Sequence, residues 1–99
     1  APRRDRAALY PKTLHGLTAM IYGLVGAASR ETLPAAIEIL ADLRGLGGQG
    51  YSGLPLSELA SFGFELLIGR ALEQGWEAVF AESPDYATYA AERQAAGLP

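Results

Sequence analysis

The choice of apolar residues constrains this chain more than any other feature of its sequence. Alanine occurs 18 times and leucine 15 times, whereas valine and isoleucine together occur only six times. β-Branched residues favour strands because they pack well on a pleated surface, while Ala and Leu favour helices because they lose little side-chain entropy there. The balance predicts an all-α fold, a compact bundle of short helices.

Length and charge limit what the chain binds. The 99 residues are enough for one domain with one core, and the absence of cysteine excludes disulfides and thiolate metal sites. The formal net charge of −3 disfavours nucleic acid, whose binding needs a basic surface. No apolar run approaches the ~18 residues of a membrane span. We expect a cytoplasmic protein that binds neither nucleic acid nor membrane.

Apolar residues at steps of three and four predict four helices, or five if a glycine divides one of them. Residues 1–12 are expected to form a flexible N-terminal arm, and residues 13–99 a single helical domain. Thr13 is expected to cap a helix that runs from Leu14 to Ala28. Ser29 and Thr32 both signal the start of a second helix, which runs to Arg44.

Glycines and prolines mark the ends of the later elements. Gly45 is predicted to end the second helix in a left-handed conformation, and a Gly-rich loop follows over residues 45–55. The third helix opens near Pro55 and is broken or bent at Gly75. Ser83-Pro84-Asp85 signals the last helix, which runs to about Ala96.

A ferredoxin-like α+β fold is the alternative. Strands over residues 18–25, 64–71 and 76–81, with helices over 33–44 and 84–96, would give the order βαββα. The shortage of β-branched residues and the missing fourth strand count against it.

The stretch GLGGQG matches the dinucleotide-binding pattern G-x-G-x-x-G at Gly45, Gly47 and Gly50. That fingerprint works only between a buried strand and a helix, with an acid about 20 residues further on. Here a helical segment precedes the glycines, Pro55 follows them, and the expected acid falls near Arg70. We therefore interpret the stretch as a connector and expect no cofactor.

Isolated polar residues indicate no catalytic or metal site. His15, the one histidine, shares a polar stripe with Thr18 and Tyr22, but no acid or nucleophile motif is near it. The acidic pairs Glu58/Glu65 and Glu73/Glu77 are interpreted as solvated. Arg70 falls on an apolar stripe, where it either extends along the core edge or pairs with an acid.

The aromatic residues of the last helix are the candidate partner-binding site. Tyr86, Tyr89 and Arg93 lie at i, i+3 and i+7, and Tyr and Arg are enriched at protein interfaces. Trp76 lies upstream, and Tyr51 ends the glycine-rich stretch. The open alternative is that the tyrosines cover the core with their hydroxyls in water.

These patterns favour a non-catalytic helical interaction module, accessory subunit or oligomerisation domain, with a protein partner or a second copy as its ligand. A chain this short, with a hydrophobic content of 49%, cannot bury all of its apolar residues, so we expect a partner to cover part of its apolar surface. The alternative is a small-molecule-binding or cofactor-free enzyme domain of the dimeric ferredoxin-like type, which would use His15 and a tyrosine.

Overall fold

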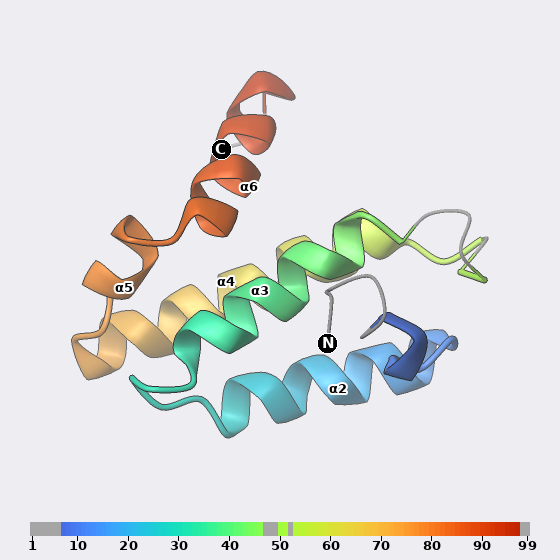
Figure 1. The fold of residues 1–99 in the computed structure, drawn as a ribbon, viewed down its shortest axis with the longest axis horizontal. Helices are drawn as coiled ribbons and strands as arrows, with labels where there is room; N and C mark the ends of the chain where they lie inside the picture. Colours follow the sequence, from blue (N-terminus) through green and yellow to red (C-terminus); the bar gives the residue numbers. More distant parts are fainter. Residues whose placement is uncertain (1–6, 47–49, 52, 98–99) are drawn as a thin grey trace.

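The computed structural model describes residues 7–46, 50–51 and 53–97, and its regular structure is helical (Figure 1). In this part of the chain a 3-10 turn, η1 (Ala7–Leu9), precedes five α-helices and no strand is present. The predicted all-α bundle is confirmed. The helices are α2 (Leu14–Gly26), α3 (Leu33–Arg44), α4 (Leu56–Gln74), α5 (Ala78–Ala81) and α6 (Pro84–Ala95).

The ferredoxin-like alternative is not supported. Residues 18–25 lie in α2 and residues 64–71 lie in α4, while residues 76–81 contain the short helix α5. These segments hold few β-branched residues, so local preference and tertiary packing both favour helix.

Helices α2, α3 and α4 pack against one another and form the body of the molecule. Helix α6 packs on α3 and α5, and Figure 1 shows it leaving the body at a steep angle, with the C-terminal end pointing away. Fully buried Leu and Ile side chains from α2, α3 and α4, together with Phe64, fill the centre. The largest of these side chains are Leu17, Ile21, Leu33, Ile37, Leu40, Leu43, Phe64 and Leu67.

Two helix ends form as their sequences indicate. The Thr13 hydroxyl accepts a hydrogen bond of 3.0 Å from the Gly16 amide at the start of α2. Gly75 adopts the left-handed conformation, with φ of 77°, and the next amide, that of Trp76, donates to the Ala71 carbonyl at 2.8 Å. This is a Schellman-type ending, which needs a positive φ that glycine adopts freely. Gly75 thus divides the predicted third helix into α4 and α5.

Gly45 does not form the predicted left-handed cap. It has φ of −92°, and its amide donates to the Asp42 carbonyl at 3.0 Å. Helix α3 therefore ends in a tightened turn that leads into Leu46, whose side chain is buried. The reach of Leu46 into the core sets this path, and a positive φ is not required.

The start of α3 also differs in its bonding from the prediction. Thr32 occupies the cap position but its hydroxyl makes no bond to the helix. Instead the Thr32 hydroxyl accepts from the Ser29 amide at 2.8 Å, and the Ser29 hydroxyl accepts from the Thr32 amide at 3.2 Å. The two start signals therefore form one reciprocal turn that leads into the helix.

Part of the predicted arm contacts the body. Residues 1–6 lie outside the described part of the chain, but the Tyr10 hydroxyl donates to Asp42 Oδ2 on α3 at 3.0 Å. The Tyr51 hydroxyl in turn donates to the Tyr10 carbonyl at 3.1 Å. These bonds connect residue 10 both to α3 and to the Gly-rich loop.

Gly63 on α4 permits close packing against α2 and α3. A Cβ atom at this position would lie 2.6 Å from Leu40 Cδ2 and 3.3 Å from Ile21 Cγ2, and both neighbours are fully buried. We expect Gly63→Ala to lower the free energy of unfolding by about 1–3 kcal/mol, because a packed core must move to admit the methyl group. Urea denaturation measures the change.

Gly69 provides the matched control on the same helix. Nothing lies within 4 Å of a Cβ placed there, and its φ is not positive. Gly69→Ala should raise the free energy of unfolding by about 0.5–1 kcal/mol through helix propensity. Equal effects at the two glycines would contradict the packing described for Gly63.

Candidate functional site

The start of α6 fixes the direction of its functional side chains. Ser83 has an extended conformation, and its hydroxyl accepts from the Tyr86 amide at 3.1 Å. Pro84 supplies a fixed φ at the first helical position, where its missing amide costs nothing. The helix therefore begins as Ser83-Pro84-Asp85 predicts. Tyr86, Tyr89 and Arg93 then project on the side that meets the body of the molecule.

An aromatic cluster attaches α6 to α4. Tyr89 is 3% exposed, and its ring stacks on that of Phe64 with centroids 4.2 Å apart and planes at 27°. Tyr86 meets Phe64 edge-on at 5.8 Å and meets Phe80 edge-on at 4.9 Å. Such pairs contribute about 0.5–1.5 kcal/mol each beyond the area that they bury. The cluster is the apolar anchor of α6.

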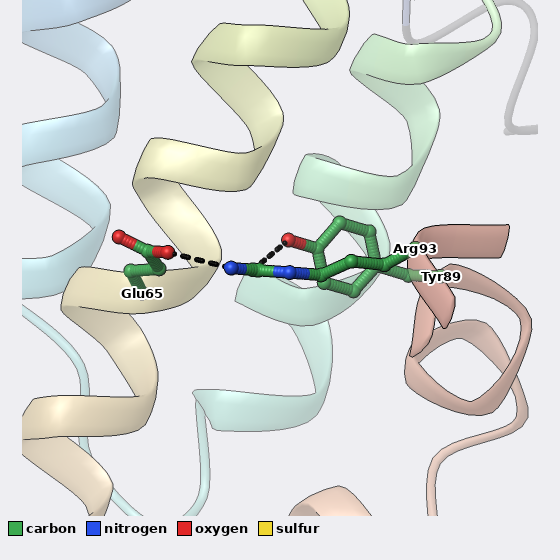
Figure 2. Close-up of polar contacts among 3 residues, drawn as sticks. All are labelled: Glu65, Tyr89 and Arg93. Atoms are coloured by element: carbon green, nitrogen blue, oxygen red, sulfur yellow. Dashed lines mark hydrogen bonds and ion pairs between the residues drawn. The ribbon is translucent and has the colours of Figure 1, made fainter. Parts of the chain in front are cut away.

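Arg93 connects Tyr89 to α4, as Figure 2 shows. Its Nη1 atom donates to the Tyr89 hydroxyl at 2.9 Å, and its Nη2 atom donates to Glu65 Oε1 at 2.9 Å. The hydrogen bond from Glu65 raises the pKa of Arg93, and the bond to Tyr89 raises it further. Both partners of the ion pair are partly exposed, so its main effect is to set geometry rather than to add stability.

Arg44 on α3 contacts the side of α6 that carries Glu92. Its guanidinium pairs with Glu92, and its Cζ atom lies 5.4 Å from the centre of the Tyr89 ring. The Tyr89 ring thus lies among Phe64, Arg44 and Arg93, with contacts from α3, α4 and α6. A ring held by three partners has little freedom to rotate, and it fixes the position of the helix that carries it.

An open groove of about 520 Å³ lies between α4 and α6. Its apolar side chains are Ile68 and Ala90 and the rings of the two tyrosines, and its polar groups come from the Arg93–Glu65 pair and Gln94. This volume falls in the range of ligand sites, which combine apolar walls with a few placed polar groups. The lining residues are Glu65, Ile68, Tyr86, Tyr89, Ala90, Arg93 and Gln94.

The structure brings together three of the five predicted partner-binding residues. Tyr86, Tyr89 and Arg93 all line the α4/α6 groove, although Tyr89 offers it little exposed surface. Trp76 is half-buried after α4 and does not line the groove. Tyr51 is buried in the core, and burial raises the pKa of its hydroxyl. A partner-binding role for these residues stays a prediction.

Four groove residues were not predicted: Glu65, Ile68, Ala90 and Gln94. Glu65 was interpreted as solvated, yet it pairs with Arg93, which lies 28 positions further along the chain. Glu65 and Ile68 are three apart, so the sequence indicates that they share a helix face. It carries no signal that this face meets α6.

Arg70 is partly buried and bonds to a backbone carbonyl, a partner that neither predicted option named. Its Nε and Nη2 atoms donate to the Ala28 carbonyl at 3.2 and 3.0 Å, and its guanidinium lies 5.6 Å from the centre of the Trp76 ring. It therefore satisfies a backbone acceptor just beyond the end of α2. Because a carbonyl is present at every position, a sequence gives no means of choosing this partner.

The other sequence candidates lie outside the groove. His15 is exposed on α2. No group of three or more His, Asp or Glu side chains in the described ranges is arranged to hold a metal ion. Across the same ranges, no helix combines the length and apolar character needed to cross a membrane.

Comparisons with known proteins found no matching family model, no similar curated protein and no matching solved structure.

Replacement of Tyr89 tests how α6 is attached. Tyr89→Ala should lower the free energy of unfolding by about 3–5 kcal/mol, because it removes the buried ring and leaves a cavity. Tyr89→Phe keeps the ring and should cost only about 0.5–1.5 kcal/mol, for the lost hydroxyl bond to Arg93. Urea denaturation measures both values. Similar losses for the two variants would show that the hydroxyl, and not the stacking, anchors α6.

Proposed function

We propose that this chain is a non-catalytic helical interaction module that binds a protein partner in the α4/α6 groove. The observation that carries the proposal is the composition of the groove, which is lined by Tyr86, Tyr89 and Arg93 together with the aliphatic Ile68. Tyrosine and arginine dominate the energetic centres of protein interfaces, because each joins a large contact area to a polar tip.

The groove is open to solvent, which favours a polypeptide segment over a small ligand that needs enclosure. It is bounded by α4 and α6, and an amphipathic helix can lie in such a groove with its apolar face inward. The partner's apolar side chains would contact Ile68, Tyr86 and Ala90. Polar groups at its flank would contact Gln94 and the Arg93–Glu65 pair.

The groove is also held in place before a partner arrives. Tyr89 is stacked on Phe64, and Arg93 is already bonded to Tyr89 and Glu65. Side chains fixed in advance lose little conformational entropy on binding, so more of the contact energy remains as affinity. This supports Tyr86 and Arg93 as anchors, with Tyr89 and Glu65 as the residues that position them.

Net charge further supports a protein partner. Arg93 is neutralised by Glu65, Arg44 is neutralised by Glu92, and the chain carries a formal charge of −3. Binding to phosphate backbones depends on basic groups that release counterions, and the α4/α6 groove offers no surplus of them.

Neighbouring alanines on α6 allow a matched test. Ala90 lines the groove, whereas Ala91 is exposed and is not among its lining residues. We expect Ala90→Arg to fill the groove and to reduce capture of the partner from a source-organism lysate at least about tenfold, a change of ~1.4 kcal/mol. Ala91→Arg should capture the partner as the wild type does.

Quantitative mass spectrometry compares wild type, Ala90→Arg and Ala91→Arg baits, after circular dichroism has shown equal helix content in the three. Capture of the same proteins in equal amounts by all three would exclude the α4/α6 groove as the binding surface. A wild-type bait that enriches no protein over a bead control would contradict the interaction function itself.

A further inference from the structure

Helix α2 differs from the other long helices in its charge. The sequence from Thr13 to Ser29 contains no Asp, Glu, Lys or Arg. Among the described helices of more than one turn, α3, α4 and α6 all carry charged residues, including Glu38 on α3, Glu58 on α4 and Asp85 on α6. The polar side chains of α2 are those of His15, Thr18 and Tyr22, and its other residues are apolar or glycine.

The bundle covers only one side of α2. Leu17 and Ile21 are fully buried, but Leu14 is 50% exposed and Tyr22 is 56% exposed. The Tyr22 ring meets that of Phe62 on α4 edge-to-face, with centroids 5.7 Å apart, and Phe62 is itself 37% exposed. Two large rings therefore pair at the surface, where their apolar area meets water.

An apolar groove continues this face toward α3. It has a volume of about 250 Å³, and its lining includes Met20, Leu24, Ala27, Ala35 and Ile39, with no charged side chain. The outer face of α2, which includes His15, and this groove form one surface without Asp, Glu, Lys or Arg, which we name the α2 surface. Contiguous apolar surfaces of a few hundred Å² commonly mark interaction sites.

We infer that the α2 surface is a contact between two copies of this chain. Under two-fold symmetry a patch contacts the same patch of the second copy. Side chains of like charge must therefore not face each other across the contact. The α2 surface meets this condition because it brings no charged side chain opposite its copy. The chain as a whole carries a formal charge of −3, so contacts through its charged faces meet like charges.

The alternative occupant is a lipid surface, and the charge pattern disfavours it. Helices that lie at membrane surfaces carry Lys and Arg along their polar face, which attract anionic headgroups. Helix α2 has no Lys or Arg between Lys12 and Arg30, and its one histidine, His15, lies in its first turn. A second protein copy needs no such attraction.

The size of the α2 surface predicts a weak dimer. A helix of 13 residues is about 20 Å long. One face of a helix this short, with the adjoining groove, is smaller than the ~800 Å² per partner of a standard stable interface. The dimer should therefore be weak and form only at high protein concentration.

Sedimentation velocity tests the inference over protein concentrations from about 10 µM to about 1 mM. The wild type should shift from monomer to dimer across this range. Ala19→Arg places a charge in the middle of the α2 surface, and it should remain monomeric at the highest concentration. Ala91→Arg is the matched control, because Ala19 and Ala91 are both exposed alanines inside helices; it should dimerise as the wild type does.

Two results would overturn the inference: a wild type that stays monomeric throughout, or an Ala19→Arg variant that dimerises normally. Monomeric wild type that floats with neutral phosphatidylcholine vesicles would instead assign the α2 surface to lipid.

Ala90→Arg separates this inference from the proposed function, because it should lose the captured partner and still dimerise. Ala19→Arg should lose the dimer and still capture the partner.

Discussion

The stacking of Tyr89 on Phe64 is the contact on which the position of α6 depends. Tyr89 is the buried residue of that helix, and it meets a ring at the centre of the core. The hydroxyl of Tyr89 receives the Arg93 bond, and the face of its ring receives the Arg44 cation. The two ion pairs at its flanks can form only because the ring has already brought α6 to α3 and α4. The α4/α6 groove exists as a consequence of this one attachment.

The molecule therefore has two parts with different physical origins. Helices α2, α3 and α4 are joined by Leu and Ile packing, and Gly63 leaves room on α4 for the side chains of Leu40 and Ile21. Helix α6 is added to this body by aromatic and polar contacts. Each proposed surface arises from one of these parts. The α2 surface arises because the body covers α2 on one side only. The α4/α6 groove arises from the angle at which α6 is attached. Because they lie on different helices, a partner and a second copy could bind at the same time.

Local signals in the sequence predicted the helices and their ends well. They did not predict the contacts between residues that are distant in the sequence. The caps at Thr13 and Ser83 and the break at Gly75 depend on bonds to neighbouring residues, which spacing reveals. The Arg93–Glu65 pair joins two helices whose packing angle no local pattern encodes. Tyr51 was placed in a Gly-rich loop and considered available to a partner; it is buried in the core, where its hydroxyl donates to the Tyr10 carbonyl, 41 positions away. Burial of a loop residue depends on the path of the whole chain.

The most direct test of this account is the solution contact between Tyr89 and Phe64. Nuclear Overhauser effects between the two rings should be strong, because their centroids lie 4.2 Å apart. The amides of the middle of α6 should also exchange with solvent far more slowly than those of an isolated helix. Absence of ring-to-ring Overhauser effects, together with rapid exchange along α6, would show that α6 is not attached as described and that the α4/α6 groove does not persist in solution.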